Sequence, residues 1–235
     1  MSSIPNLAII LPVFNPRNGW DKRLKESIVM LNKAIDIPYQ IIIVDDGSTE
    51  RIDVEYIQNL KTEFPFLKWL SYKKNQGKGY AIRYGLQFTN AKNYIYTDFD
   101  FPFGYKAVND TYQLLNQNNY ALVIGKRGKS YFKILPFKRK VMSLGLQMFN
   151  YFLTGFKVSD TQAGLKGLNN KGKNIFLQGQ TNSFLFEIEF IKDVLKSKLP
   201  YTNIEIVPKP NITMTNFGST TIKKELISLM KIIFR

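Results

Sequence analysis

Cysteine and histidine are both absent from this sequence of 235 residues. Without cysteine the chain has no disulfide bond, no thiolate nucleophile and no zinc-thiolate site, which fits a reducing compartment. Without histidine it lacks the commonest general base and a frequent metal ligand. Acid–base chemistry and metal binding are therefore expected to fall to aspartate and glutamate.

Acidic residues are themselves scarce, with 18 Asp and Glu against 33 Lys and Arg and a net charge of +15. Such an excess predicts a polyanionic partner: nucleic acid, an anionic membrane surface or a phosphorylated ligand. The chain has no recognised nucleic-acid-binding motif, and its aromatic residues lie largely in apolar segments. A nucleic-acid-binding module is therefore only a remote alternative.

Long apolar runs are missing too. No run reaches the roughly 20 residues that a membrane span needs, and the N-terminus lacks the basic-then-apolar pattern of a signal peptide. We expect a cytoplasmic protein, peripheral on the cytoplasmic face of a membrane. The C-terminal segment 220–235 predicts a basic amphipathic helix, which either packs on the domain or lies on an anionic bilayer.

Apolar runs alternate with segments of helical periodicity along the chain. The expected strands are Leu7–Val13, Gln40–Val44, Lys68–Ser71, Tyr94–Thr97 and Tyr120–Gly125. Strands separated by helices predict an α/β fold with right-handed crossovers. The expected architecture is a mostly parallel central sheet with helices on both faces.

Two of these strands end in pairs of carboxylates. Asp45 and Asp46 follow one, and Asp98 and Asp100 follow another. The carboxyl ends of parallel strands share an edge, where open α/β sheets bind ligands. Asp98 and Asp100 share a side of an extended chain, and carboxylate oxygens suit Mg²⁺ or Mn²⁺. We predict a metal site at Asp98 and Asp100.

Further polar groups are expected at the same edge. The end of the first strand supplies Pro12, and the turn that follows it supplies Phe14 and Asn15. Lys78 lies in a Gly-Lys-Gly loop that opens a helix, where backbone amides favour an anion. Arg127 follows a later strand and adds a cationic group that suits a diphosphate. Each motif alone also fits a plain turn or a solvated basic loop, and their shared edge favours a ligand site.

The second half of the chain mixes apolar and basic residues. Segment 131–153, which contains Arg139, is either core or a surface for an amphiphile with a phosphate group. Asp160 lies in a polar loop, and Glu187 and Glu189 lie in a strongly apolar helix. A carboxylate in such surroundings has a cationic partner or a functional role. The two glutamates point in different directions, so at least one is expected to be solvated.

Five motifs together resemble those of the family 2 glycosyltransferases with the GT-A fold, in order and spacing. They are Pro12–Asn15, Val44–Ser48, Asn75–Gly79, Asp98–Asp100 and Asp160–Gly164. The resemblance runs from about Leu7 to Val207 and is strongest to the dolichyl-phosphate glucosyltransferase and dolichol-phosphate mannose synthase group. It implies one catalytic domain, 1–219, with a nucleotide-sugar-binding half, 1–104, and an acceptor-binding half, 105–219. The amphipathic helix 220–235 would follow.

The resemblance also implies roles for individual residues. The donor-binding set would be Pro12, Phe14, Asn15, Asp45, Asp46, Lys78, Asp98 and Arg127. Within it, Asp45 would accept a hydrogen bond from a uracil N–H. Asp98 and Asp100 would bind Mg²⁺ or Mn²⁺. The catalytic set would be Asp160, Glu187 and Arg139.

The reaction implied is inverting transfer of a hexose from a nucleotide sugar, of the UDP-glucose or GDP-mannose type, to a polyprenyl or dolichyl phosphate at a membrane surface. A phosphate acceptor is already anionic and needs no general base. Arg127 and Arg139 would position it, and Asp160 and Glu187 would orient the sugar or the arginines. The alternative is transfer to a saccharide hydroxyl in cell-surface polysaccharide synthesis, with Asp160 or Glu187 as the base.

Overall fold

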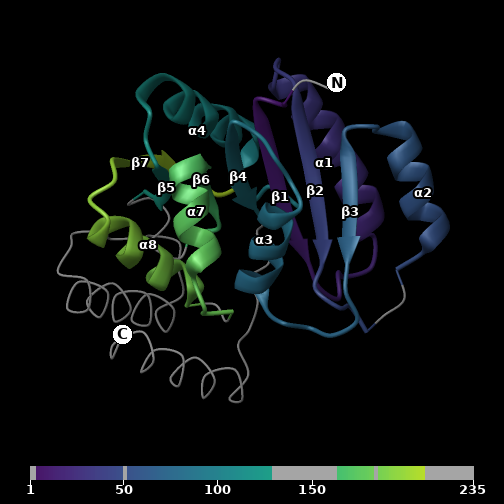
Figure 1. Ribbon diagram of the computed structural model, residues 1–235. Helices are drawn as coiled ribbons and strands as arrows, with labels where there is room; N and C mark the ends of the chain where they lie inside the picture. Colours follow the sequence, from purple (N-terminus) through teal and green to yellow (C-terminus); the bar gives the residue numbers. More distant parts are fainter. Residues whose placement is uncertain (1–3, 50–51, 129–162, 183–184, 210–235) are drawn as a thin grey trace.

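The computed structural model describes residues 4–49, 52–128, 163–182 and 185–209 (Figure 1). The expectations for segment 131–153, which contains Arg139, for Asp160 and for the amphipathic helix 220–235 concern residues outside these ranges. Within the described residues, no helix combines the length and apolar character needed to span a membrane.

Strands and helices alternate through most of the described chain. The strands are β1 (Leu7–Val13), β2 (Tyr39–Asp45), β3 (Leu67–Ser71), β4 (Asn93–Thr97), β5 (Leu122–Arg127), β6 (Leu165–Asn169) and β7 (Tyr201–Ile206). The helices are α1 (Trp20–Ala34), α2 (Val54–Glu63), α3 (Lys78–Gln87), α4 (Gly104–Asn118), α7 (Asn170–Gln178) and α8 (Phe186–Lys196). The strands predicted from apolar runs are all present, with ends shifted by a few residues.

The strands form a seven-stranded sheet in the order β3-β2-β1-β4-β6-β5-β7. The pairs β1–β2, β1–β4, β2–β3 and β5–β7 are parallel, whereas β6 is antiparallel to both β4 and β5. The prediction of a mostly parallel sheet is therefore confirmed. Because β6 runs against the others, it begins at the edge where they end.

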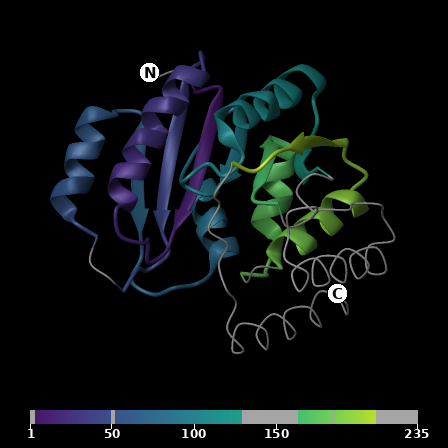
Figure 2. The same ribbon diagram turned by 180° about the vertical axis from the view of Figure 1, so that it is seen from behind.

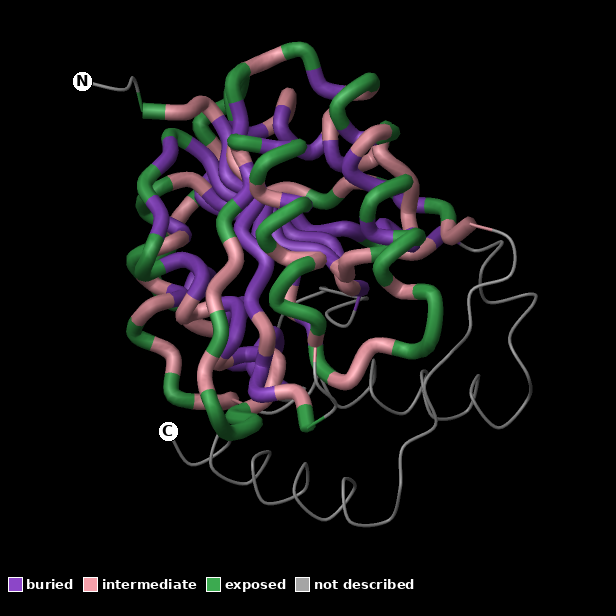
Figure 3. The backbone as a smooth tube through the Cα atoms, turned by 90° about the vertical axis from the view of Figure 1, so that its right-hand side faces the viewer, coloured by how far each residue is buried: buried purple, intermediate pink, exposed green. Residues whose placement is uncertain are grey.

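Helices cover both faces of the sheet, as predicted (Figures 1 and 2). Successive residues of β1 face opposite sides: Ile9 belongs to the apolar cluster with α1, α2 and α4, and Ile10 to the cluster with α3, α7 and α8. A strand buried on both faces needs a continuous apolar sequence, which explains the run Leu7–Leu11. Figure 3 shows the buried strands at the centre, surrounded by more exposed helices and loops.

Candidate functional site

The two acidic strand ends lie at one edge of the sheet. β1 pairs with β2 on one side and with β4 on the other, and Val13 lies opposite Asp45. With neighbouring strands about 4.8 Å apart, β2 and β4 are separated by roughly 10 Å. The prediction that Asp45 and Asp98 share an edge is confirmed, and the distance between their strands suits a ligand that spans both.

Asp45 is held by the turn that follows it. The backbone N–H and the hydroxyl of Ser48 donate to Asp45 Oδ1 at 3.0 and 2.6 Å. Ser48 Oγ in turn accepts from the backbone N–H of Asn15 at 3.0 Å, which ties this turn to the end of β1. Within the described residues no group donates to Asp45 Oδ2. That oxygen is therefore available to a ligand donor.

The expected donor-binding residues at the end of β1 and just after it differ in what they contact. Pro12 is half-buried, and the Phe14 ring is 47% exposed at this edge. Asn15 instead supports the neighbouring turn, since its Oδ1 accepts from the Thr49 N–H at 2.8 Å. Phe14 thus offers an apolar surface to a planar ligand, whereas the side chain of Asn15 contacts protein.

Asp46 points away from the ligand edge and is only 3% exposed. Its carboxylate accepts from the Tyr72 hydroxyl at 2.7 Å, from Asn75 Nδ2 at 2.9 Å, and from the N–H groups of Gln76 at 2.8 Å and Gly77 at 3.0 Å. Burial raises the pKa of Asp46, and these hydrogen bonds oppose the shift. The donor contact expected of Asp46 is therefore corrected: its side chain supports the loop that opens α3.

Gly47 allows the turn after β2 to pack closely against the loop that leads into α3. Its φ is +67°, and a Cβ there would lie 2.6 Å from backbone atoms of Lys74 and Asn75. Only glycine combines that φ with that contact at little energetic cost. The loop is thereby fixed before α3 begins at Lys78.

Lys78 and Asp98 form an ion pair at the same edge. Lys78 Nζ lies 2.6 Å from Asp98 Oδ1, and the two side chains are 22% and 43% exposed. Burial acts to lower the pKa of Lys78, but the negative charges of Asp98 and Glu187 outweigh it and raise the pKa. Lys78 is therefore a permanent cation at this edge, which suits an anionic ligand. The N–H groups of Gly77 and Gly79 at the start of α3 already have protein partners, since Gly77 donates to Asp46 and Gly79 donates to the Asn182 carbonyl at 3.1 Å.

Asp98 and Asp100 do not lie on an extended chain, as the sequence predicted. The Phe101 N–H donates to the Asp98 carbonyl at 3.0 Å, so these residues form a turn with Asp100 on its exposed rim. Partial desolvation and the negative charge of Asp98 both act to raise the pKa of Asp100. A divalent cation shared by the two carboxylates would relieve this repulsion, and oxygen donors suit Mg²⁺ or Mn²⁺. The described residues contain no cluster of three or more acidic side chains that could hold a metal. The two aspartates thus fit a cation that takes its other oxygen ligands from a bound diphosphate or water.

A second ion pair lies beneath the first, inside the protein. Glu187 is 4% exposed, and its Oε1 lies 2.9 Å from Lys166 Nζ and 3.3 Å from the Tyr96 hydroxyl. Burial raises the pKa of Glu187, while the charges of Lys166 and Lys78 act to lower it. Sequence reasoning singled out Glu187 but missed Lys166. A lone lysine within the otherwise uncharged strand Leu165–Asn169 was the available signal.

Glu189 is buried as well, at 5% exposure. Its carboxylate accepts from the N–H groups of Gln180 at 3.1 Å and Thr181 at 2.8 Å. The expectation that at least one of the two glutamates is solvated is therefore wrong. The same segment also binds Arg83, which donates to the Thr181 carbonyl at 3.1 Å and was not predicted from the sequence. Together Glu189 and Arg83 hold residues 180–182 beside α3.

The remaining basic site residue, Arg127, ends β5 and is half-buried. β5 runs in the same direction as β4 but is separated from it by β6, so Arg127 reaches the same edge farther along the sheet.

The backbone at Gly164, four residues after Asp160, packs closely against Asp98. A Cβ added at Gly164 would lie 2.8 Å from Asp98 Oδ2. The start of β6 is therefore part of the wall of the site.

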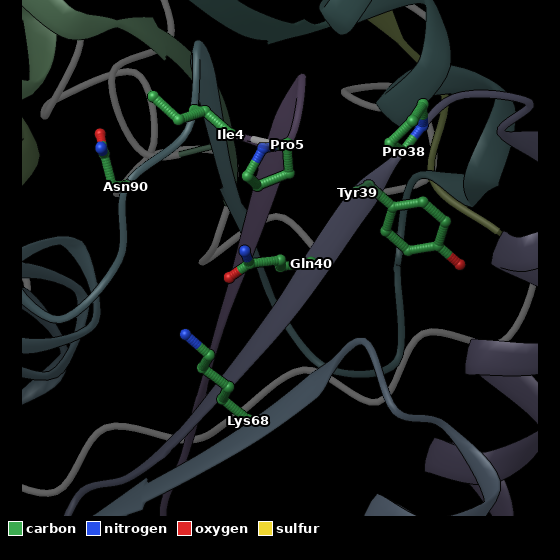
Figure 4. Close-up of a pocket in the computed structure, with 7 residues that line it drawn as sticks. All are labelled: Ile4, Pro5, Pro38, Tyr39, Gln40, Lys68 and Asn90. Carbon is green, nitrogen blue, oxygen red and sulfur yellow. The ribbon is translucent and has the colours of Figure 1, made fainter. Parts of the chain in front are cut away.

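A cavity of about 370 Å³ lies at the opposite edge, near the amino ends of β1 and β2 (Figure 4). Its lining residues are Ile4, Pro5, Pro38, Tyr39, Gln40, Lys68 and Asn90. Lys68 is the one charged member of this lining, and no carboxylate contributes. The cavity therefore has no carboxylate to hold a metal and is separate from the acidic edge.

A mostly parallel sheet with acids at its carboxyl edge is the arrangement of the GT-A fold, and comparison with solved structures agrees. The chain superimposes with a TM-score of 0.63 on glucosyl-3-phosphoglycerate synthase from Mycobacterium tuberculosis in complex with Mn²⁺, UDP and glucosyl-3-phosphoglycerate. The match covers 97% of this chain and 80% of that one at 14% identity. At this identity the likeness establishes the fold.

The sequence profile of Glycosyl transferase family 2 matches residues 8–173, well over half of the chain. The chain belongs to glycosyltransferase family 2. It is 26% identical over 215 residues to a dolichyl-phosphate beta-glucosyltransferase of Dictyostelium discoideum, covering 85% of this chain and 65% of that protein. It is 23% identical over 227 residues to the human dolichyl-phosphate beta-glucosyltransferase, covering 87% and 68%. The chain thus spans about two thirds of the length of these relatives.

Proposed function

We propose that this chain is a metal-dependent, inverting hexosyltransferase that moves a sugar from a nucleotide sugar to a polyprenyl phosphate. The observation that carries the proposal is the meeting of Asp45, the Lys78–Asp98 ion pair and Asp100 at one sheet edge, in a chain that belongs to glycosyltransferase family 2. The relatives named as dolichyl-phosphate beta-glucosyltransferases support glucose as the sugar and a dolichyl-type phosphate as the acceptor.

The donor side follows from the groups at the edge. Asp45 Oδ2 accepts an N–H from the nucleobase, and the exposed ring of Phe14 packs against the base. Asp98 and Asp100 hold Mg²⁺ or Mn²⁺, which supplies positive charge to offset the charge that develops on the departing nucleotide. Lys78 binds the diphosphate oxygens.

The acceptor side requires no general base, because a phosphate monoester oxygen is already an anion. Its lone pair forms the new bond to the anomeric carbon while the nucleoside diphosphate departs with the electrons of the old bond. Attack from the opposite side inverts the anomeric centre. Arg127 and Arg139 position the acceptor phosphate, and Asp160 and Glu187 orient the sugar or these arginines. The net charge of +15 draws the protein to the anionic cytoplasmic surface of a membrane that carries such an acceptor.

The test is a transfer assay with vesicles containing dolichyl phosphate and radiolabelled UDP-glucose or GDP-mannose. We expect label in the organic phase from one donor with Mn²⁺ or Mg²⁺, and none after chelation with EDTA. Unchanged transfer in EDTA would refute the metal dependence. Failure of the folded protein to label lipid from either donor would refute the proposed reaction.

A second candidate is transfer to a saccharide hydroxyl, which needs a base. The observation in its favour is the carboxylate of Glu187, which lies behind the Lys78–Asp98 ion pair and whose pKa is raised by burial. In that case Glu187→Gln should reduce turnover far more than Arg139→Met. The lipid-phosphate reaction predicts that loss of Arg139 is at least as damaging.

A further inference from the structure

Lys166 is a fully buried lysine in the middle of the sheet. It lies on β6, opposite Tyr96 on β4 and Ile124 on β5, and its side chain has 0% exposure. A buried ammonium group is stable only where acceptors compensate its charge. Lys166 has them in Glu187 Oε1, at 2.9 Å, and in the backbone carbonyl of Ala163. One amino group therefore links α8 to the backbone that leads into β6.

The backbone at Gly164, just before β6, packs against the Lys78–Asp98 ion pair at the ligand edge. A Cβ on Gly164, the residue after Ala163, would lie 2.8 Å from Asp98 Oδ2 and 3.6 Å from Lys78 Nζ. The Ala163 carbonyl that Lys166 binds also accepts from the Leu165 N–H at 2.8 Å. Because the space between Gly164 and Asp98 is too small for a Cβ, a displacement of this backbone would change how the Lys78–Asp98 ion pair packs.

Charge connects the same groups. Glu187 bound to Lys166 also attracts Lys78, and Lys78 is bound to Asp98. Positive and negative groups thus alternate from the buried strand to the ligand edge. If Lys166 were neutral, the buried charge of Glu187 would lose its nearest compensation and act more strongly on Lys78.

We propose that Lys166 is a positioning residue: through Glu187 and the Ala163 carbonyl it fixes Asp98 and Lys78 in the arrangement that the diphosphate of a nucleotide sugar requires. The proposal rests on the proposed function for the identity of the ligand. The Lys166 side chain has no exposed surface, so it would act on a bound nucleotide only through these neighbours. An ammonium group has three N–H donors, so it bridges a carboxylate and a carbonyl at once.

The test combines Lys166→Met, Glu187→Gln and the double variant. Lys166→Met leaves a buried carboxylate uncompensated and should lower the melting temperature. The double variant removes that charge and should recover most of the loss. The double variant should nevertheless bind UDP with Mn²⁺ at least tenfold more weakly than the wild type, measured by calorimetry, because no ammonium group binds the Ala163 carbonyl.

Lys173→Met is the matched control. Lys173 is half-buried on α7, donates to the Thr89 carbonyl at 2.8 Å and lies 4.5 Å from the centre of the Tyr94 ring, at the opposite end of β4. Its loss should lower stability without changing UDP affinity. If the recovered double variant binds UDP as tightly as the wild type, Lys166 only balances the charge of Glu187 and the proposal is overturned.

Amide hydrogen exchange separates this proposal from the proposed function. In the double variant the Leu165 N–H, bound to the Ala163 carbonyl, should exchange at least tenfold faster than in the wild type. Unchanged exchange at Leu165 would overturn the positioning role whatever the nucleotide affinity. A wild-type protein that binds neither UDP nor GDP with Mn²⁺ would instead refute the proposed donor, and with it the part of this inference that concerns the diphosphate.

Discussion

The Tyr72 hydroxyl donates to the buried carboxylate of Asp46 at 2.7 Å, which ties the turn after β2 to the loop that opens α3. The residue beside Asp46, Asp45, faces the ligand edge, and the loop held by Asp46 ends at Lys78. Two adjacent aspartates thus act on different ends of one site. Asp45 offers an acceptor to the nucleobase in the proposed reaction, and Asp46 places the lysine for the diphosphate.

Asp46→Asn should loosen this loop. Asparagine keeps one acceptor oxygen, but its NH₂ cannot accept. In either amide orientation at least one of the donors that now bind the carboxylate, Asn75 Nδ2 or the N–H groups of Gln76 and Gly77, therefore loses its partner. The neutral amide avoids the burial penalty that raises the pKa of Asp46, and the net loss of stability is therefore expected to be only about 1–2 kcal/mol. The sharper measurement is amide exchange at Gln76 and Gly77, which should accelerate.

Tyr72→Phe is the control for that variant. It removes one hydroxyl donor and leaves the other hydrogen bonds of Asp46 in place. Exchange at Gln76 and Gly77 should change less than in Asp46→Asn. Equal acceleration in both variants would mean that the carboxylate does not organise the loop.

Asp100→Asn should abolish metal-dependent transfer while the fold persists, because Asp100 is exposed and its removal creates no cavity. Mn²⁺ affinity, measured by electron paramagnetic resonance, should fall at least tenfold. Asp110→Asn is the control, since Asp110 is a surface acid on α4 paired with Lys106 at 2.6 Å. Full turnover by Asp100→Asn would rule out the assignment of Asp100 as a metal ligand.

Gly47→Ala should destabilise the protein more than Gly104→Ala. Both glycines have positive φ, +67° and +77°, so alanine costs roughly 1–2 kcal/mol at either position. Only at Gly47 would the new Cβ meet backbone, at 2.6 Å, whereas nothing lies within 4 Å at Gly104. We expect Gly47→Ala to lose about 1–3 kcal/mol beyond Gly104→Ala in urea unfolding. Equal losses of stability in the two variants would show that the turn at Gly47 and the loop at Lys74–Asn75 move apart without strain.

Stability should fall at alkaline pH in part through Tyr39, which is 8% exposed. Burial raises the pKa of Tyr39 to about 12, against about 10 in an unfolded chain. Between these values the unfolded chain releases the phenol proton and the folded protein keeps it. The free energy of unfolding therefore decreases as pH rises through this window, by at most about 3 kcal/mol from this group.

Tyr39→Phe removes that contribution. It also loses the hydrogen bond to Asn32 Oδ1 at 3.1 Å, so the variant should begin slightly less stable at neutral pH. Its urea midpoint should then fall less steeply than that of the wild type between pH 10 and 12. Some decline remains, because burial also raises the pKa of Tyr56 to about 12. Identical slopes in the two proteins would contradict the assignment.

Much of the fold and the edge of the site could be predicted from the sequence, because the relevant signals are local. A continuous apolar run specifies a strand covered on both faces, and strands separated by helices become parallel. Parallel strands end together, so the acids that follow the Gln40–Val44 and Tyr94–Thr97 runs had to share an edge.

What only the tertiary structure decided depends on partners distant in sequence. β6 is antiparallel between β4 and β5, which brings Gly164 onto Asp98 and buries Lys166 against Glu187. Asp46 turns inward because four donors from residues 72–77 converge on it. A sequence shows that a charge exists but not which distant group compensates it. Since a buried charge is stable only with such a partner, the packing of the sheet and its helices decided which acids face the ligand and which support the fold.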